Sequence, residues 1–364
     1  MIPLVKPFIA PSGTMIPAIQ EVLYSGYISE GDIVYEFESK LEEFIQSSNT
    51  LSLHSGTAAL HIALILTGVR HGHGDEVIST ALTAEPTNVS IGLAGGKVVW
   101  ADVDKETGLL SPQSVREKIT EKTKAIVIVH YAGMVCDMDK FNKISSEFSI
   151  PIIEDAAHAL GSKYRGNPIG SESAYACFSF QAIKHMTTVD GGALAIKNEA
   201  ECERARKLRW FGLSKGTPRL QNDITEFGYK YHMNNINAAI GLVQLQYARD
   251  IIDRHICNGK YFDQALCGVP GVSLIPYYPN TEPSYWLYTL KVENRRDFIR
   301  RLADEGVVAS ELHLRNDRHS VFSGSKCRLP NLDWFYDEFV HIPCGWWISD
   351  EDLSHIVSAI KKGW

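Results

Sequence analysis

The chain has 364 residues, of which 45% are hydrophobic and 22% are charged, and its formal net charge is −7. This composition is typical of a globular protein that buries a sizeable core in one large and one smaller domain. The negative charge argues against a nucleic-acid partner, because a phosphate backbone is bound by a basic surface. No run of about 18 apolar residues occurs, so we also expect no membrane partner. The expected partners are therefore small molecules, which can be anionic.

The seven cysteines are an odd number and form no C-x-x-C pair. This pattern favours reduced thiols over disulfides or zinc, as in a cytoplasmic protein. The first 13 residues contain three prolines and lack the apolar centre of a secretory signal. The segment HGHGDE (71–76) has two histidines without further ligands nearby, so we expect a surface turn there and no metal site.

From about residue 50, segments typical of strands and helices alternate along the chain. Short apolar or β-branched runs between helices indicate a largely parallel sheet that is covered on both faces. The helix expected at 111–120 has Ser111 as its N-cap and Pro112 in its first turn. The sequence predicts strands within 50–56, 75–80, 96–104, 123–130 and 150–157, and helices within 57–69, 111–120 and 137–148.

The alternation changes character after a strongly helical segment at 233–250. A segment rich in proline and aromatic residues (275–285) follows, and residues 286–315 then suggest a smaller α/β unit. We therefore expect an α/β fold with two domains. The large one (1–245) would contain the mostly parallel central sheet, and the small C-terminal one (246–364) would also be α/β.

The segment LHSGTAAL (53–60) reads as the end of a strand, a glycine turn and the start of a helix. Free N–H groups at such a helix start, together with the Thr57 hydroxyl, can bind a phosphate. Taken alone, this segment favours an ordinary helix cap, because threonine before an apolar run is common. The segment IPIIEDAAHAL (150–160) places Asp155 at the end of a strand, where open α/β sheets bind ligands. Asp155 could hold a protonated ring nitrogen, cap a helix or bind a metal.

The segment CFSFQAIKHMTTVDGGALA (177–195) contains a single lysine, Lys184, between a hydrophobic strand and a glycine turn. Hydrophobic surroundings lower the pKa of a lysine, and a neutral amine can attack a carbonyl to form a Schiff base. A lysine, an upstream aspartate at a strand end and a phosphate-binding helix start are together the groups that pyridoxal 5'-phosphate (PLP) requires.

These motifs resemble, in the same order, those of the DegT/StrS-type sugar aminotransferases. The resemblance rests on SGTAAL, IIEDAAHA, FSFQAIKHMTTVDGG and GYKYHMNNINAAIGLVQL, and it extends from about residue 26 to the C-terminus. It implies a fold type I PLP-dependent transferase, usually a homodimer. The activity that it implies is transfer of an amino group from glutamate or glutamine to a nucleotide-linked keto-deoxy sugar, for surface polysaccharides or glycosides.

The resemblance also assigns roles to single residues. Lys184 would form the Schiff base, Asp155 would pair with the pyridine nitrogen, and His158 would lie near the 3-hydroxyl of the cofactor. Lys230, in the loop 228–233 of a partner subunit, would help to close the phosphate site. The residues that would hold the phosphate are Gly56, Thr57, Ala58 and Ser179.

Two positions depart from the family pattern. Many relatives have an aromatic residue that stacks on the cofactor where this chain has Ala84. The common Asn-Tyr-Arg of the partner loop is here Lys230-Tyr231-His232, although lysine can still bind a phosphate as a point charge.

Substrate contacts are expected from Glu85 and His185, and from His313 and Arg315 in the segment HLRNDRH (313–319). Arginine pairs well with phosphate oxygens, but Glu85 fits a turn and 313–319 fits a solvated loop equally well.

Three other functions fit these residues less well. In the sugar 3-dehydratase branch a histidine replaces the Schiff-base lysine, whereas here His185 only adjoins Lys184. A relative that binds cofactor without turnover would not need the intact lysine, aspartate and serine. A nicotinamide-dependent dehydrogenase is disfavoured because no G-x-G-x-x-G follows a strand.

Overall fold

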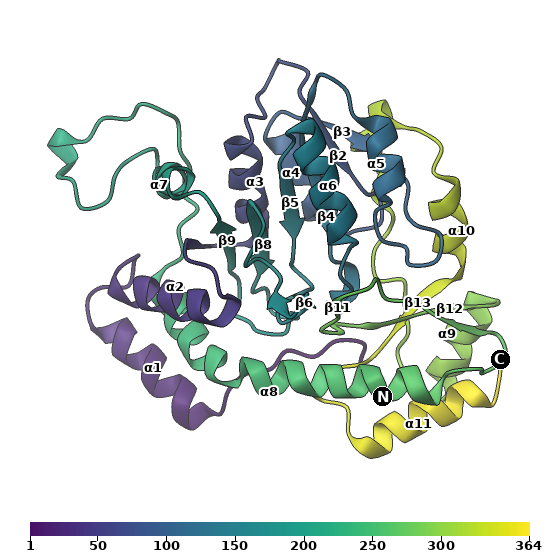
Figure 1. Ribbon diagram of the computed structural model, residues 1–364. Helices are drawn as coiled ribbons and strands as arrows, with labels where there is room; N and C mark the ends of the chain where they lie inside the picture. Colours follow the sequence, from purple (N-terminus) through teal and green to yellow (C-terminus); the bar gives the residue numbers. More distant parts are fainter.

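The computed structural model describes all 364 residues as a large body built on a central sheet and a smaller C-terminal unit, with one long helix running beneath both (Figure 1). The central sheet has seven strands in the order β1-β9-β8-β5-β4-β2-β3. Only β9 runs antiparallel to its neighbours, so the predicted mostly parallel sheet is confirmed. The strands are β1 (Thr50–Leu53), β2 (Glu76–Ser79), β3 (Lys97–Trp100), β4 (Thr123–Val129), β5 (Ile152–Asp155), β8 (Tyr175–Ser179) and β9 (Gly192–Ile196).

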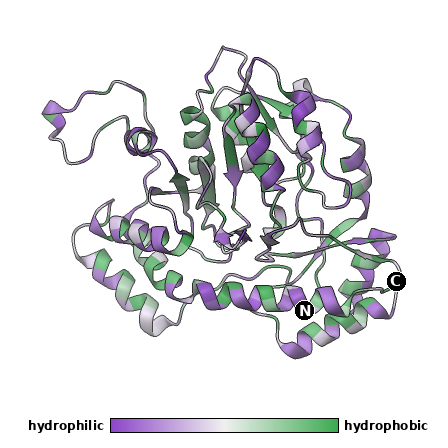
Figure 2. Cartoon of the chain, viewed as in Figure 1, coloured by the Kyte–Doolittle hydropathy of each residue, from purple (hydrophilic) through white to green (hydrophobic).

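Helices cover this sheet, and strand residues are buried on both faces because of them. Figure 2 shows the resulting distribution, with hydrophobic residues concentrated in the central strands. Ser111 accepts a hydrogen bond from the Ser114 N–H, which confirms the predicted cap. The helices of this part are α1 (Ser12–Tyr24), α2 (Asp32–Ile45), α3 (Gly56–Leu66), α4 (Glu85–Leu93), α5 (Pro112–Lys118), α6 (Met138–Phe148) and α7 (Glu199–Leu208).

Helix α8 (Asn235–Ala265) has 31 residues and is longer than the segment predicted at 233–250. Its first part packs against α1 and α2, and its last part lies beside α11 (Figure 1). The expected domain boundary at residue 245 lies inside this continuous helix. None of the helices combines the length and the apolar character needed to cross a membrane.

The C-terminal unit is a second sheet with its own core. Its antiparallel strands lie in the order β10-β12-β13, and 20 buried apolar residues form a cluster separate from the 75-residue cluster of the large body. The elements are β10 (Val272–Leu274), β12 (Tyr288–Val292), β13 (Phe339–Ile342), α9 (Arg295–Asp304) and α11 (Asp350–Lys361). A third, small sheet joins β6 (Lys163–Tyr164), β7 (Asn167–Pro168) and β11 (Thr281–Glu282).

Two connecting segments lie outside these sheets. Residues 316–338, with short 3-10 turns and α10 (Pro330–Glu338), pack their apolar side chains into the core of the large body, although they follow α9 in the sequence. The segment between α7 and α8 projects from the body instead (Figure 1), and it exposes Leu220, Ile224 and Phe227.

Candidate active site

A cavity of about 350 Å³ opens where β4, β5 and β8 end and α3 and α4 begin. This is the edge at which parallel α/β sheets place ligands, because the loops that follow the strands converge there. The cavity brings together most of the residues predicted from the sequence. Its lining includes Gly56, Thr57, Glu85, Asp155, His158, Ser179, Lys184 and His313.

Lys184 lies in the turn after β8 and enters the cavity with its amine 4.2 Å from the centre of the Trp286 ring. Burial lowers the pKa of this amine to about 8, and the Asp155 carboxylate opposes part of that effect. Trp286 is itself buried, and its indole N–H donates to the Ile183 carbonyl at 2.8 Å. Sequence analysis missed Trp286, whose only signal was its place next to a segment rich in proline and aromatic residues.

Asp155 ends β5 and is 4% exposed. One carboxylate oxygen accepts a hydrogen bond from the Thr87 hydroxyl at 2.6 Å, and the other accepts from the Ala157 N–H at 3.1 Å. Burial raises the pKa of this carboxyl, whereas the bond from Thr87 and the nearby Lys184 lower it. The hydrogen bonds fix the orientation of the carboxylate, and they leave it facing the cavity.

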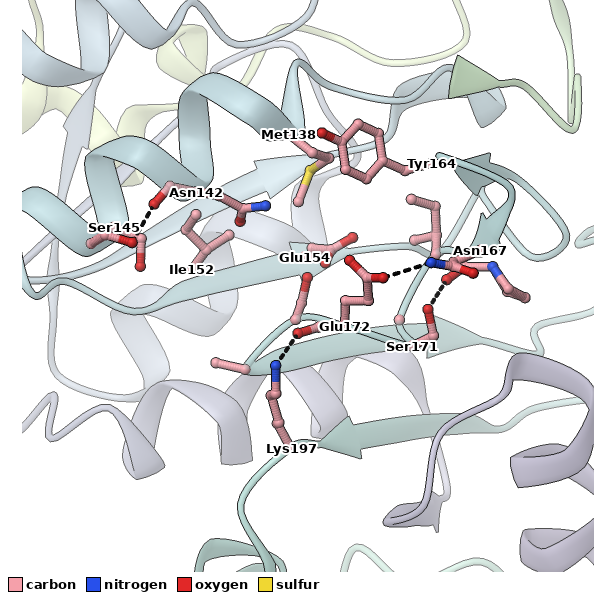
Figure 3. A pocket seen from close by; sticks show the side chains of 16 residues that line it. Met138, Asn142, Ser145, Ile152, Glu154, Tyr164, Asn167, Ser171, Glu172 and Lys197 are labelled. Carbon is pink, nitrogen blue, oxygen red and sulfur yellow. Dashed lines mark hydrogen bonds between the residues drawn. The ribbon is translucent and has the colours of Figure 1, made fainter. Parts of the chain in front are cut away.

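Glu154, the preceding residue, points to the opposite face of the sheet, as strand geometry requires. Its carboxylate accepts from His130 Nε2 at 2.7 Å and lines a second cavity of about 550 Å³. Figure 3 shows Glu154 between Asn142 and the hydrogen-bonded pair Asn167 and Glu172. None of the site residues predicted from the sequence lines this second cavity.

At the start of α3, two glycines at the end of the main cavity, Gly56 and Gly192, allow neighbouring backbone segments to approach closely. A Cβ atom on Gly56 would lie 3.0 Å from the Ser179 Cβ, and one on Gly192 would lie 2.4 Å from the Gly56 nitrogen. Ser55 caps the helix by accepting from the Ala58 N–H, so Ala58 takes part through the cap and does not line the cavity. The first N–H groups of α3 have no partner within the helix and are free to bind an anion.

His158 provides an unused donor beside Lys184. Its Nδ1 accepts from the Ala132 N–H at 3.4 Å, which leaves the proton on Nε2, and Nε2 has no partner in the chain. Burial, followed by the charge of Lys184, lowers the pKa of His158 well below its ordinary value, so the ring is neutral. The ring stacks on Trp286 with centroids 3.9 Å apart.

The cavity therefore fits PLP. It offers a partly neutral amine for the aldehyde, a carboxylate for the ring nitrogen, an unpaired N–H for a ring oxygen and a helix start for the phosphate. No Phe, Tyr or Trp side chain lines it, and Ala84 is among its lining residues. The missing aromatic residue is thus not replaced by a Phe, Tyr or Trp in this lining.

Three predicted site residues lie elsewhere. His185 is buried and faces away, with Nε2 bonded to the Ser284 carbonyl at 3.1 Å. Arg315 is 3% exposed and does not line the cavity, and its guanidinium donates to Asp317 at 2.8 Å and to Asp333 at 2.5 Å. Arg315 is therefore not available to a substrate phosphate. Lys230 is exposed in a separate hollow beside His54 and His232.

Comparison with known proteins identifies the relatives of this chain. The sequence model of the DegT/DnrJ/EryC1/StrS aminotransferase family matches residues 12–361. The protein MJ1066 of Methanocaldococcus jannaschii, whose function is uncharacterised, is 33% identical over 95% of this chain and 94% of its own length.

Solved structures agree with this result. The sugar aminotransferase CalS13 from Micromonospora echinospora is 36% identical, with a TM-score of 0.96 over 100% of both chains. AtS13 from Actinomadura melliaura is 38% identical, with a TM-score of 0.96 over 100% of this chain and 99% of its own. The PLP form of Spr1654 from Streptococcus pneumoniae is 28% identical, with a TM-score of 0.90 over 99% and 98% of the two chains.

The predicted family, fold and cofactor are thereby confirmed. The chain belongs to the DegT/DnrJ/EryC1/StrS aminotransferase family and is a PLP-dependent aminotransferase with the fold of the sugar aminotransferases.

Proposed function

We propose that the protein transfers an amino group from glutamate or glutamine to the keto group of a nucleotide-linked keto-deoxy sugar, in the biosynthesis of surface polysaccharides or glycosides. The observation that carries this proposal is the pairing of Lys184 and Asp155 in one cavity, within a chain whose solved relatives include a sugar aminotransferase. When bound, PLP supplies a pyridine ring that withdraws electrons from the carbon bearing the nitrogen.

Lys184 is the catalytic residue of this proposal, because it would hold the cofactor and later move a proton. An amine with a pKa of about 8 exchanges protons readily near neutral pH, whereas an ordinary lysine would stay charged. The Trp286 ring beneath the amine restricts where Nζ can lie, so the proton is accepted and returned at a defined position.

Asp155 would keep the ring nitrogen protonated. Its hydrogen bonds from Thr87 and the Ala157 N–H hold the carboxylate in place, and its burial strengthens the interaction with a positive partner. The N–H of His158 Nε2 would donate to an oxygen on the ring. Gly56, Thr57 and Ser179 would hold the phosphate at the start of α3.

A second copy of the chain would complete the site. Lys184 is the only lysine or arginine in the lining of the main cavity, although phosphate oxygens are commonly bound by lysine and arginine. Lys230 lies outside its own cavity, at the base of the projecting segment with its exposed Leu220 and Phe227. We propose a cytoplasmic homodimer in which Lys230 reaches the phosphate of the partner.

The test is an absorbance experiment on the purified protein with PLP. Adding glutamate or glutamine should convert the cofactor to its pyridoxamine form, and a nucleotide-linked keto-deoxy sugar should restore the first spectrum. Lys184→Ala should fail in both steps, whereas Lys122→Ala, which changes an exposed lysine, should not. Turnover by Lys184→Ala at the normal rate would overturn the proposal.

A further inference from the structure

Glu85 stands at the mouth of the main cavity between two histidine rings. His313 Nδ1 lies 3.7 Å from one of its carboxylate oxygens, and His319 Nε2 lies 3.8 Å from the other. Both distances exceed a hydrogen bond, so the carboxylate keeps its capacity to accept. Glu85 is the first residue of α4, where the helix dipole stabilises a negative charge.

The two histidines are held in place by an amide clamp. The Asn316 side chain donates to the Thr83 carbonyl at 2.9 Å and accepts from the Asn88 amide at 2.9 Å. Asn316 and Asn88 are fully buried. The backbone N–H of Asn316 also donates to the Ala81 carbonyl at 2.8 Å. The segment 313–319 is therefore fastened to the segment 81–88 that carries Glu85.

The opposite side of the same segment is anchored by Arg315. Its ion pairs with Asp317 and Asp333 hold the chain between the two histidines against α10. The motif HLRNDRH thus acts as a unit, in which the central residues fix the backbone and the terminal histidines face Glu85. Because this segment is already ordered, a ligand that binds to it does not have to order the loop first.

The carboxylate of Glu85 has no lysine or arginine partner, and its only close charged or titratable neighbours are the two histidine rings. His313 Nε2 and His319 Nε2 are buried and have no partner. Burial lowers the pKa of His313 to about 4, so this ring does not neutralise Glu85 at neutral pH. Of the two arginines in this motif, Arg315 is occupied by its own acids, and Arg318 is exposed with its guanidinium 5.0 Å from the centre of the Tyr336 ring. An anionic substituent would therefore meet a carboxylate that no lysine or arginine pairs with.

We propose that Glu85, held between His313 and His319, selects an uncharged keto-hexose as the amino acceptor. Its carboxylate accepts hydrogen bonds from sugar hydroxyls, and it repels a keto-uronic acid that would bring a second carboxylate to the same place. This inference rests on the proposed function. It adds to that function the charge of the acceptor, and it names Glu85 as the residue that distinguishes an uncharged acceptor from an anionic one.

The test uses the enzyme in its pyridoxamine form and two acceptors with the same nucleotide, UDP-4-keto-6-deoxyglucose and UDP-4-keto-glucuronic acid. Stopped-flow spectra give the maximal rate and the apparent dissociation constant for each sugar. The wild type should prefer the uncharged sugar by at least about tenfold, the effect of one hydrogen bond to a charged group. Glu85→Gln should weaken binding of the uncharged sugar and improve that of the uronic acid, so that the preference falls at least about tenfold.

The glutamate step separates this proposal from the proposed function. Glu85→Gln is compared with the wild type only after it too has reached the pyridoxamine form, and an unchanged circular dichroism spectrum shows that the variant folds. Glu121→Gln, which changes an exposed glutamate in a loop, is the matched control and should keep the wild-type preference. Failure of every amino donor with the wild type would refute the aminotransferase proposal itself.

Two results would overturn the role of Glu85 while leaving the aminotransferase proposal intact. One is a wild type that converts the uronic acid as well as the uncharged sugar. The other is an unchanged preference in Glu85→Gln.

Discussion

Replacing Lys184 by methionine should stabilise the cofactor-free protein while abolishing its activity. Methionine has nearly the same length and no charge to desolvate. Burial lowers the pKa of the Lys184 amine from 10.5 to about 8. Below pH 8 the folded protein therefore contains an ammonium group that would be better solvated in the unfolded chain, a penalty of roughly 3 kcal/mol.

The net effect should be somewhat smaller than this penalty. Contact of the ammonium with the Trp286 ring recovers about 1 kcal/mol. Part of the side chain also reaches solvent through the cavity, which screens the charge further. We expect Lys184→Met to raise the free energy of unfolding by about 2 kcal/mol at pH 7.

The effect should depend on pH in a defined direction. Between pH 8 and 10.5 the unfolded chain binds more protons at this residue than the folded protein does, so the stability of the wild type rises with pH. The advantage of Lys184→Met should accordingly shrink over this range. Urea denaturation of both cofactor-free proteins at pH 7, 9 and 10 measures the difference in their free energies of unfolding. All other titrating groups contribute equally to the two proteins, so their contributions cancel in this difference. A difference that stays constant with pH, or a less stable variant at pH 7, would refute the reasoning.

Three further changes test other parts of the structure. Asp155→Asn should slow the glutamate step by at least about a hundredfold, as expected for loss of one prearranged electrostatic contact, and a rate within twofold of wild type would exclude the role of Asp155. Asn316→Ala removes the buried bonds to Thr83 and Asn88 and should cost about 1–3 kcal/mol in urea denaturation, so an unchanged midpoint would argue against the clamp. Arg209→Met leaves the buried carboxylate of Glu38 without its 2.5 Å partner and should cost about 3–5 kcal/mol, which an unaltered melting curve would contradict.

The sequence predicted those features that depend on residues close together in the chain. The strand that leads to Asp155, the helix start at Gly56 and the turn at Lys184 each carry local signals, namely apolar runs that end in an acid, a glycine or a single lysine. Because the ends of parallel strands share one edge of the sheet, the order of these motifs was enough to predict that they meet.

Features set by long-range packing could not be predicted in this way. Arg315 looked available for substrate because its partner Asp333 lies 18 residues away, on a helix whose position depends on the whole fold. His185 adjoins Lys184 in the sequence, yet its ring turns toward the Ser284 carbonyl, 99 residues distant. Trp286 reaches Lys184 only because the segment after α8 returns to the large body.

The central claim is that Lys184 holds the cofactor, and reduction of the holoenzyme with borohydride tests it directly. Reduction fixes a lysine-bound PLP as a stable secondary amine, so peptide mass spectrometry can locate it. The structure predicts that the peptide containing Lys184 carries the mass of the reduced PLP. The corresponding peptide of Lys184→Ala should carry no such added mass. Attachment of the cofactor to another lysine in the wild type, or to none, would contradict the account.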